Sequence, residues 1–331
     1  MRYLGSKATI TANILEVIGA RPGGHFCDPF AGIGTVASAA KRRGMRVTCG
    51  DVLTFPHYFQ IARVCHARMP TFARLRAAQG FRTPAECIAH LNAPAVRREG
   101  WLFRNYAARR RFFTRANARH IDGAWEEIRG WNAAGLLSDR ERAFLLASLV
   151  ESADRVANTA GTYYAYLKSW TAKAHKPFEL RPVAPTPGPR ATAVLGEAAE
   201  VAERHGKGIL YLDPPYNRRC YARYYHLPET LARLETPPLH GKSGMPLVAR
   251  PVSRFTSPAQ AHAALAELLE RSSAPTVVFH YARDGLIDLE DARSLLARLG
   301  DVADHALAAP GYTTRAGVRR VTHTLLVMRR G

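Results

Sequence analysis

Asp213, Pro214, Pro215 and Tyr216 follow directly after the apolar run Ile209–Leu212. The run predicts a short buried strand, and the two prolines force the backbone out of the sheet at the carboxyl end of that strand. Ligands bind at this end of the strands in open α/β sheets. The four residues therefore predict a ligand site that offers a carboxylate, a proline carbonyl and an aromatic ring.

This combination suits chemistry on the amino group of a nucleic-acid base. The exocyclic nitrogen of adenine or cytosine is a poor nucleophile because its lone pair is delocalised into the ring. The Asp213 carboxylate and the Pro214 carbonyl are acceptors for the two amino hydrogens, and the Tyr216 ring offers a stacking face. Taken alone, the four residues 213–216 fit an ordinary proline turn equally well.

A glycine loop near the N-terminus favours the functional interpretation. The segment His25–Val36 runs from a short apolar strand through Gly32 and Gly34 into a helix, so the backbone can approach a ligand at a helix N-terminus. A second predicted strand, Arg46–Cys49, is followed by Asp51. This acid lies about 20 residues beyond the loop, the separation at which a carboxylate reaches ribose hydroxyls.

The loop predicts S-adenosylmethionine rather than a dinucleotide as the ligand. Ala37 occupies the third glycine position of the dinucleotide pattern. Asp28, just before the loop, would repel a pyrophosphate but suits the cationic methionine end of S-adenosylmethionine. The alternative is a plain turn between a strand and a helix.

The chain resembles the Dam-like adenine-specific DNA methyltransferases, in particular modification methylases of the FokI type. The resemblance rests on Asp-Pro-Phe-Ala-Gly-Ile-Gly at 28–34, Asp-Pro-Pro-Tyr at 213–216 and Arg-Tyr-Leu-Gly-Ser-Lys at 2–7. Further similar segments are residues 159–163 with 166–168, residues 224–226 with Glu229 and Thr230, and residues 241–244. The agreement at separated sites covers most of the chain and is more specific than any single motif.

The resemblance implies roles for individual residues. It implies that Tyr3 and Lys7 lie beside the cofactor and the target base, and that residues 213–216 surround a flipped adenine. Glu197 stands where relatives often carry an Asp against the cofactor's adenine. The implied cofactor-binding residues are Tyr3, Lys7, Asp28, Pro29, Phe30, Gly32, Gly34, Asp51, Glu197 and Asp213.

Net charge indicates a polyanionic partner. The chain carries 47 basic and 27 acidic residues, a formal net charge of +20. Residues 61–120 contain thirteen arginines and only two acids, with rings at 101, 103, 106, 112 and 113 interleaved, which suits gripping phosphates and packing beside bases. The predicted DNA contacts here are Arg109, Arg110, Arg111 and Arg115. The alternative is a solvated helix face.

The loop after residue 216 is also rich in cations and rings. It places them beside the predicted catalytic site, where the phosphates of a flipped nucleotide would lie. Arg218, Tyr221, Tyr225 and His226 are the predicted DNA contacts in this loop. The alternative is a tyrosine-rich packing loop. His226 on its own is expected to orient a neighbour by hydrogen bonding rather than to act as a general base.

The pattern along the chain predicts an α/β fold. We expect a Rossmann-like sheet of the S-adenosylmethionine-dependent methyltransferase type, with an inserted, mostly α-helical target-recognition domain. Residues 1–62 and 190–331 would form the catalytic domain, and residues 63–189 the arginine-rich insertion, ending in a Pro-rich linker at 182–189.

Local signals set the expected elements. Residues 117–176 show a helical pattern with no convincing strand, and Ser138-x-x-Glu141 predicts a capping box at the start of a helix over 143–157. After the catalytic loop the expected order is a helix at 258–272, a strand at 276–279, a helix at 289–299 and a strand at 321–328. His280 and Tyr281 would line the active site or pack at its rim.

Cysteine usage and hydropathy exclude several protein classes. Five cysteines show no CxxC pairing, which argues against a disulfide framework and a structural zinc. No apolar run approaches the roughly 18 residues of a membrane span, and the N-terminus reads as a motif rather than a signal peptide. A cytoplasmic protein without a metal is expected.

The sequence thus predicts an enzyme that transfers a methyl group from S-adenosylmethionine to adenine in double-stranded DNA. Direct transfer after base flipping needs neither a metal nor a covalent nucleophile. The expected setting is restriction-modification or defence, with a cognate restriction endonuclease or defence-system component as partner. The alternatives are an RNA adenine methyltransferase, a cytosine amino-methyltransferase and a non-catalytic DNA-binding regulator.

Overall fold

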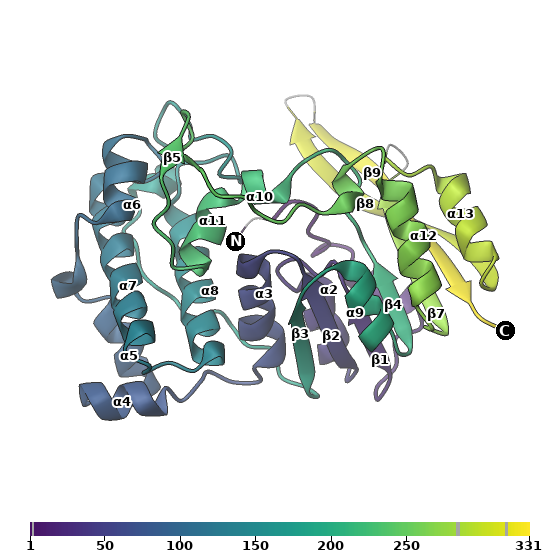
Figure 1. The fold of residues 1–331 in the computed structure, drawn as a ribbon, viewed down its shortest axis with the longest axis horizontal. Helices are drawn as coiled ribbons and strands as arrows, with labels where there is room; N and C mark the ends of the chain where they lie inside the picture. Colours follow the sequence, from purple (N-terminus) through teal and green to yellow (C-terminus); the bar gives the residue numbers. More distant parts are fainter. Residues whose placement is uncertain (2, 283–284, 315–316) are drawn as a thin grey trace. The chain divides into compact units, whose positions relative to one another are not determined.

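The computed structural model describes residues 1, 3–282, 285–314 and 317–331, and all of their side chains except those of 308–322. The chain forms two compact units, drawn in Figure 1. Unit 1 consists of Met1–Leu4, Leu53–Pro185 and Tyr221–Arg250, and unit 2 of Gly5–Val52, Thr186–Cys220 and Pro251–Gly331. Arg2, the first residue of the 2–7 motif, lies outside the described residues.

Unit 2 is built on a seven-stranded sheet in the order β3-β2-β1-β4-β7-β9-β8. The first five strands are parallel, and β9 is antiparallel to both of its neighbours, β7 and β8. The strands are β1 His25–Asp28, β2 Arg46–Asp51, β3 Ala191–Leu195, β4 Ile209–Leu212, β7 Thr276–Ala282, β8 Asp301–Thr314 and β9 Gly317–Arg329. The expected α/β sheet is confirmed.

Helices cover the sheet because its central strands are apolar on both faces. Leu210, Tyr211 and Leu212 of β4 are all buried, as expected for a central parallel strand. Leu210 and Leu212 belong to one core with residues of α9, α12 and α13, which lie in front of the sheet in Figure 1. The helices of unit 2 are α1 Thr11–Val17, α2 Thr35–Arg42, α9 Ala198–His205, α12 Ala261–Arg271 and α13 Leu289–Ala297, with a 3-10 turn at Arg254–Thr256.

The strand order changes direction between β1 and β4. The chain runs outward from β1 to β2 and β3, and then returns to the other side of β1 as β4. Ligands in open α/β sheets bind outside the carboxyl ends of the strands at such a switch point. The fold therefore points to the loops that follow β1 and β4.

Unit 1 is mainly helical. Its elements are α3 Thr54–Gln60, η1 Ile61–Cys65, α4 Ala73–Gln79, α5 Pro84–Leu91, η2 Pro94–Val96, α6 Trp101–Phe103, η3 Arg104–Ala108, α7 Arg115–Ala133, α8 Asp139–Val156, η4 Ala172–His175, α10 Tyr221–Tyr224 and α11 His226–Ala232, with a small hairpin of β5 Leu239–His240 and β6 Met245–Pro246. The predicted capping box is confirmed: Ser138 and Glu141 cap α8 reciprocally. Residues 53–185 contain no strand.

The helical pattern ends earlier than expected, at Val156 rather than near residue 176. Asn158 explains the difference, because its side chain takes over backbone hydrogen bonds. Its amide nitrogen donates to the carbonyls of Arg111 and Leu167 at 3.1 and 3.0 Å, and its oxygen accepts from the Thr171 N–H at 3.0 Å. These bonds fold residues 158–171 into an irregular loop.

Four of the five rings in the arginine-rich segment are buried in the core of unit 1. Phe103, Tyr106, Phe112 and Phe113 are at most 2% exposed. The prediction that they pack beside bases is therefore wrong in this structure. Large apolar rings stabilise a helical unit when they are buried in its interior, and these rings are used in that way.

The division into units differs from the expected domain boundaries. Tyr221–Arg250, assigned to the catalytic domain by sequence, packs within unit 1. Compactness does not test which residues recognise a target, so the functional division stays a prediction. Within the described part of the chain, no helix combines the length and the apolar character needed to span a membrane.

Candidate active site

The carboxyl edge of the unit 2 sheet carries four acidic residues. Asp28 ends β1, Asp51 ends β2, and Asp213 follows β4. Glu197 is exposed at the N-cap of α9, two residues after β3. Asp51 pairs with Leu195 in the parallel register, and the strand order β3-β2-β1-β4 arranges the acids in a row from Glu197 to Asp213.

The loop between β1 and α2 is shaped by its glycines. Gly32 and Gly34 have φ values of 50° and 79°, a left-handed backbone that residues with a side chain rarely adopt. Gly34 is the N-cap of α2, and no side chain caps that helix end. Pro29 is buried, and the half-buried Phe30 ring packs edge-on against Phe255 with centroids 4.9 Å apart. The loop is held by its own backbone, because the Ala31 N–H donates to the Gly50 carbonyl at 3.0 Å and the Gly34 N–H to the Ala31 carbonyl at 2.8 Å.

Asp28 is a buried carboxyl group with unused bonding capacity. It is 2% exposed, and its Oδ1 accepts the Phe30 N–H at 3.1 Å. Its other oxygen accepts no hydrogen bond within the described chain. Burial, and then the negative charge of Asp213, raise the pKa of Asp28 well above its usual range. A bound cation would stabilise the charged form.

Lys7 and Asp213 form the charged pair of this site. The Lys7 ammonium donates to Asp213 Oδ2 at 2.5 Å and to the Gly5 carbonyl at 2.9 Å, and the side chains are 4% and 15% exposed. Burial raises the pKa of Asp213, and Lys7 acts in the opposite direction. Asp213 Oδ1 accepts no hydrogen bond from any described residue, so this carboxyl group also keeps an acceptor.

The residues after Asp213 are held by the segment that follows β7. Pro214 is buried, and Pro215 and Tyr216 are half-buried. The Tyr216 carbonyl accepts the Leu286 N–H at 3.1 Å, and its ring stands edge-on to Tyr281, with centroids 6.2 Å apart. The turn is therefore fixed by packing while part of the Tyr216 ring is accessible.

A buried polar group that sequence analysis only partly anticipated lies next to this pair. Tyr211 Oη and His280 Nδ1 are 2.5 Å apart, and the rings of His280 and His323 are 4.9 Å apart. Burial, and then the positive charge of Lys7, lower the pKa of His280, and the same causes lower that of His323 to about 4. Both imidazoles are therefore neutral at pH 7, so they do not repel Lys7.

Tyr3, Tyr221 and Tyr225 lie together in unit 1. The Tyr3 ring stacks on Tyr225 with centroids 5.1 Å apart and an interplanar angle of 22°. Tyr225 is buried, and its hydroxyl accepts the Leu4 N–H at 2.8 Å, while the Tyr221 hydroxyl donates to the Leu4 carbonyl at 3.3 Å. These rings fix residues 3–4 to the start of α11.

His226 is also buried in unit 1. Its Nε2 lies 2.8 Å from the Tyr163 carbonyl, so this nitrogen carries the proton and donates. Burial lowers the pKa of His226 to about 4. This hydrogen bond agrees with the orienting role expected of His226 from sequence.

The predicted DNA-contacting arginines differ in what they bind within the chain. Arg109 is exposed and makes no hydrogen bond or ion pair with described residues. Arg110 donates to three backbone carbonyls, Arg111 donates to the Lys168 carbonyl at 2.9 Å, and Arg115 lies over the Phe103 ring at 4.8 Å. Arg218, in unit 2, is exposed.

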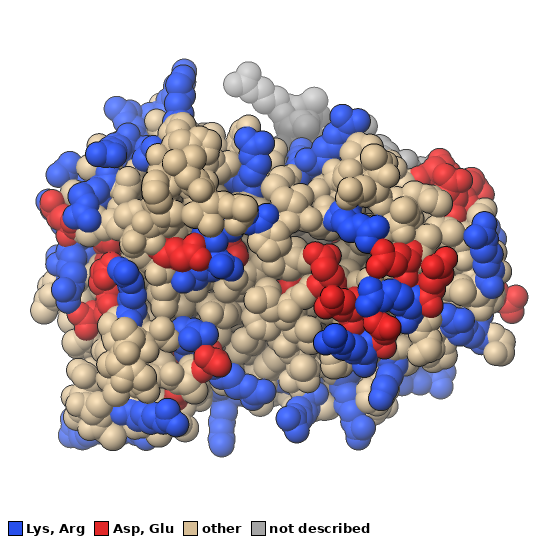
Figure 2. Space-filling view, viewed as in Figure 1, with Lys and Arg blue, Asp and Glu red and all other residues tan. Residues whose placement is uncertain are grey.

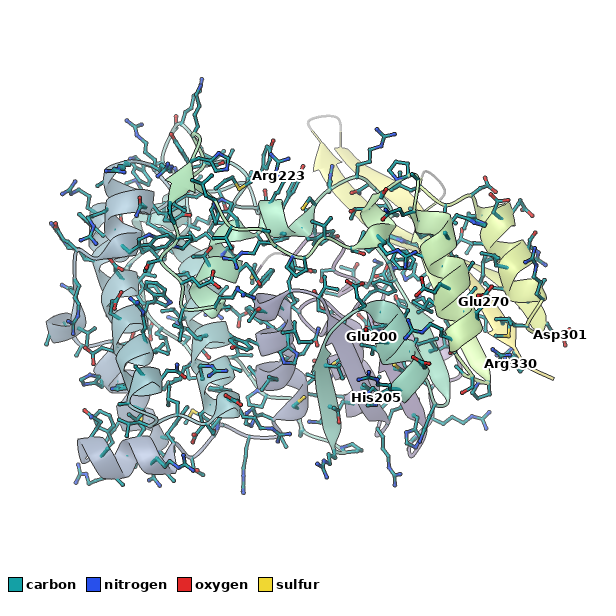
Figure 3. The ribbon with its side chains drawn as sticks, in the orientation of Figure 1. Glu200, His205, Arg223, Glu270, Asp301 and Arg330 are labelled. Atoms are coloured by element: carbon teal, nitrogen blue, oxygen red, sulfur yellow. The ribbon has the colours of Figure 1, made fainter. Side chains whose placement is uncertain are left out.

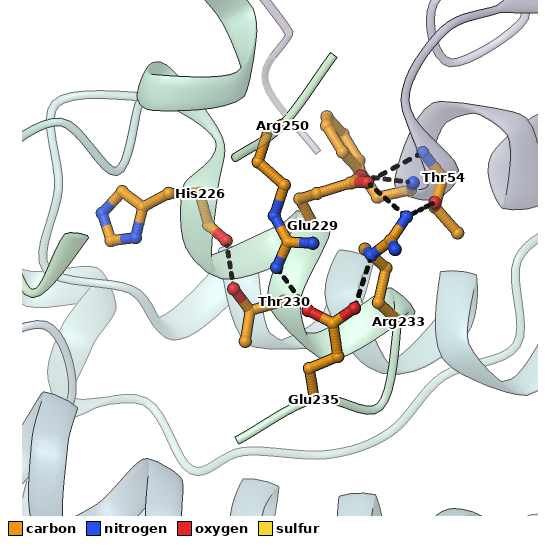
Figure 4. Close-up of polar contacts among 8 residues, drawn as sticks. Thr54, His226, Glu229, Thr230, Arg233, Glu235 and Arg250 are labelled. Carbon is orange, nitrogen blue, oxygen red and sulfur yellow. Dashed lines mark hydrogen bonds and ion pairs between the residues drawn. The ribbon is translucent and has the colours of Figure 1, made fainter. Parts of the chain in front are cut away.

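A polar network that the sequence pattern does not predict surrounds α11 and is drawn in Figure 4. Glu229 is fully buried and accepts the N–H groups of Thr54 and Phe55 at 3.1 and 2.9 Å, which caps α3. Arg233 donates to Thr54 Oγ1 at 3.2 Å and pairs with Glu235, which also binds Arg250. The resemblance at Glu229 and Thr230 is the signal that marked this segment.

The outer faces of the unit 2 helices are charged, and some of these charges pair with one another. Figure 3 shows Glu200 on α9 and Glu270 on α12. In Figure 2, acidic side chains gather over these helices, where Arg271 pairs with Glu203 and Glu267 at 2.6 and 3.2 Å. At the carboxyl edge of the sheet, by contrast, the ion pair is the buried one between Lys7 and Asp213.

Comparison with known proteins identifies relatives of this arrangement. Residues 3–282 match the family model of the D12 class N6 adenine-specific DNA methyltransferases. The chain is 31% identical over 308 residues to the type II methyltransferase M.FokI of Planomicrobium okeanokoites, covering 91% of this chain and 47% of that protein. It is 30% identical over 307 residues to the type II methyltransferase M.CviAII of Paramecium bursaria Chlorella virus 1, covering 90% and 88%.

The chain spans about half the length of several curated relatives that it matches, M.FokI among them. Among solved structures, magnesium protoporphyrin IX methyltransferase from Synechocystis PCC 6803 is similar with a TM-score of 0.36 and 9% identity. That likeness covers 98% of this chain and 79% of the other. It is too limited to support an inference about function.

Proposed function

The chain belongs to the D12 class N6 adenine-specific DNA methyltransferase family, and from this membership we propose that it methylates the exocyclic amino group of adenine in a specific sequence of double-stranded DNA. The methyl donor in this proposal is S-adenosylmethionine. The observation that carries the proposal is Asp213 at the end of β4, held by Lys7 at 2.5 Å with one carboxylate oxygen unused. That is the acceptor an amino group requires.

The row of acids fits a cationic ligand with ribose hydroxyls. We propose that Asp28, Phe30 and the glycine loop hold its methionine end, Asp51 the ribose and Glu197 the adenine. The buried, partly unused carboxyl group of Asp28 supports this assignment, because an uncompensated charge at such depth is costly. S-adenosylmethionine would supply the methyl group as an electrophile on a sulfonium centre.

The chain's own contribution to the reaction is to prepare the amino nitrogen. The free oxygen of Asp213 and the Pro214 carbonyl, which accepts no hydrogen bond from described residues, would each bind one amino hydrogen. The lone pair is then directed away from the ring. As positive charge develops on the nitrogen, the Asp213 carboxylate stabilises it. Lys7 fixes the carboxylate in place, so little reorganisation is needed.

The target adenine must leave the duplex to reach this turn, at a cost of a few kcal/mol. The accessible part of the Tyr216 ring is the proposed stacking face for the flipped base. Exposed arginines such as Arg109 and Arg218 are the proposed phosphate contacts, and residues 63–189 the proposed target-recognition region. Their positive charge would offset part of the flipping cost through phosphate binding.

The deciding experiment is a methyl-transfer assay with matched acceptors. The chain is incubated with isotopically labelled S-adenosylmethionine and with one sequence pool as duplex DNA, single-stranded DNA and duplex RNA. Products are digested to nucleosides and identified by mass spectrometry. We expect label in N6-methyladenine of duplex DNA, confined to one sequence context by modification-sensitive sequencing. Label in RNA alone, in cytosine, or in no acceptor would contradict the proposal.

A restriction-modification or defence setting is the finer part of the proposal, with a cognate endonuclease as the expected partner. Methylation within a recognition sequence would block cleavage there. Plasmid DNA from cells that express the chain should therefore resist an endonuclease that cuts at the methylated sequence. DNA from cells that express the Asp213→Asn variant should be cut. Equal cleavage of both would contradict a protective role.

A further inference from the structure

The hairpin of β5 and β6 in unit 1 ends in a tight turn at residues 241–244, here called the 241–244 turn. Its strands pair in antiparallel register, and the Leu247 N–H donates to the Pro238 carbonyl at 2.9 Å at the hairpin's base. Gly241 and Gly244 have φ values of 68° and 69°. The turn therefore depends on glycine at both ends.

Two side chains hold this turn by its carbonyl groups. Arg110 donates from Nε to the Lys242 carbonyl at 3.1 Å and from Nη2 to the Gly241 carbonyl at 3.0 Å. Its Nη1 donates to the Asn105 carbonyl at 2.8 Å, which ties the guanidinium to its own segment. The buried Tyr106 hydroxyl donates to the Gly244 carbonyl at 2.7 Å.

Three of the four carbonyl groups of the turn accept hydrogen bonds from within the chain, whereas several donors of the turn do not have a bond of this kind. Lys242 is exposed and Ser243 half-buried. Their backbone N–H groups, the Lys242 ammonium and the Ser243 hydroxyl make no hydrogen bond with described residues. Successive backbone N–H groups beside a cation form an anion-binding arrangement.

We propose that the 241–244 turn binds a phosphate group of the DNA backbone, and that Arg110 is a positioning residue that holds the turn. This inference rests on the proposed function, which supplies duplex DNA as the ligand. Backbone N–H groups and an ammonium fit phosphate oxygens, which are found along every DNA sequence. Arg110, expected from sequence to touch phosphate itself, acts through the turn.

The test is duplex DNA binding by the full chain, measured as a function of salt concentration. The logarithm of the binding constant falls linearly as log salt rises, and each lost phosphate contact makes this negative slope shallower by roughly 0.9. Lys242→Ala should lose about that much, equally on duplexes of unrelated sequence. Lys207→Ala is the matched control, because Lys207 is exposed just before β4, at the opposite edge of the unit 2 sheet from the acids. An unchanged slope for Lys242→Ala overturns the inference.

Arg110→Lys separates the two roles of this side chain. It keeps the positive charge but cannot donate to two turn carbonyls in a fork. A positioning role predicts a reduced slope for Arg110→Lys, and no further loss when Lys242→Ala is added. Tyr106→Phe, which alters no charge, should also reduce the slope. A wild-type slope for Arg110→Lys beside a reduced one for Lys242→Ala overturns the positioning role. Thermal melts confirm that each variant is folded.

Failure of this inference is distinguishable from failure of the proposed function. Wild-type chain that methylates adenine, with an unchanged slope for Lys242→Ala, overturns the turn site alone. Wild-type chain that binds duplex DNA with the expected variant slopes but transfers no methyl group overturns the enzymatic proposal alone. Wild-type chain that does not bind duplex DNA overturns the turn site directly.

Discussion

The two units use buried carboxyl groups in opposite ways. In unit 1, Glu229 accepts two backbone N–H groups of α3, and Asp122 accepts two of α6 at 3.2 and 3.0 Å. In unit 2, Asp28 accepts one N–H and Asp213 accepts one ammonium, and each keeps an oxygen without a bond from the described chain. The first pair of acids completes the fold, whereas the second pair keeps the acceptor oxygens that the proposed ligands would use.

The difference gives a criterion for separating structural from functional acids. A buried carboxylate is costly unless hydrogen bonds or charges compensate it. Backbone N–H groups supply that compensation permanently in unit 1. In unit 2 it is incomplete, and a cationic cofactor or an amino group would complete it. The same criterion separates Arg110, which binds carbonyls, from Arg109, which binds no described residue.

The largest expected effect comes from removing the charge of Asp213. Asp213→Asn is nearly isosteric and keeps one acceptor, but it loses the charge that stabilises the amino nitrogen during transfer. Single-turnover methyl transfer should fall by about a hundredfold or more, as for other preorganised electrostatic groups. Asp301→Asn is the matched control, an exposed carboxylate at the start of β8. Turnover near the wild-type rate for Asp213→Asn would refute the mechanism.

Asp51 should contribute to cofactor affinity. Asp51→Ala removes a charge-assisted hydrogen bond to ribose, worth about 1.5 to 3 kcal/mol, so S-adenosylmethionine should bind roughly 10 to 150 times more weakly. Calorimetry measures this directly. DNA affinity in the absence of cofactor should not change. Equal affinities of variant and wild-type chain for the cofactor would remove Asp51 from the site.

Glu229 should contribute to the stability of the fold and little to the methyl-transfer rate. Glu229→Gln replaces one acceptor oxygen by an amide donor that faces the N–H groups at the start of α3. We expect a loss of about 1 to 3 kcal/mol in the free energy of unfolding, measured with denaturant. The methyl-transfer rate per folded molecule should stay within a few-fold of wild type. A large rate loss at unchanged stability would break the comparison between the units.

Sequence patterns predicted the central strands better than the edges of the sheet. β1, β2, β4 and β7 were expected, because buried parallel strands are nearly continuous apolar runs. β3 and β8 were not expected, and both lie at sheet edges. Leu195 in β3 is 48% exposed, and β8 begins with the exposed Asp301. Edge strands bury less surface, so their pattern is weaker.

For the candidate site, sequence located the strand ends but not the partners. Asp28, Asp51 and Asp213 could be placed because parallel strands bring their carboxyl ends to one edge. Glu229 caps α3 by binding Thr54 and Phe55, which precede it in the sequence by 175 and 174 residues. No local pattern encodes such a contact. For the same reason the carbonyl contacts of Arg110 could not be foreseen from its neighbours in sequence.

Asp28 should make cofactor affinity depend on pH. Its pKa is raised, so in the free protein the carboxyl group holds its proton above the usual range. A bound cation favours the carboxylate, so binding releases the proton. Affinity for S-adenosylmethionine should therefore rise as pH rises towards the pKa of Asp28, by at most about tenfold per pH unit. Calorimetry in buffers of different ionisation enthalpy detects the proton. Asp28→Asn should remove the pH dependence, and its persistence would exclude Asp28.

The smallest expected effect concerns Arg109, an exposed arginine of unit 1 that makes no hydrogen bond or ion pair with described residues. If it contacts a phosphate, Arg109→Ala should make the negative slope of log K against log salt shallower by roughly 0.9. Binding to all duplex sequences should weaken alike. Arg119→Ala is the control within unit 1, because Arg119 pairs with Glu99 and lies over the Phe103 ring at 5.3 Å. Its removal should leave the slope unchanged, since its charge is already compensated. Equal slopes for both variants and wild type would mean that Arg109 is only a solvated side chain, and that an arginine without a described partner in unit 1 does not mark a ligand contact.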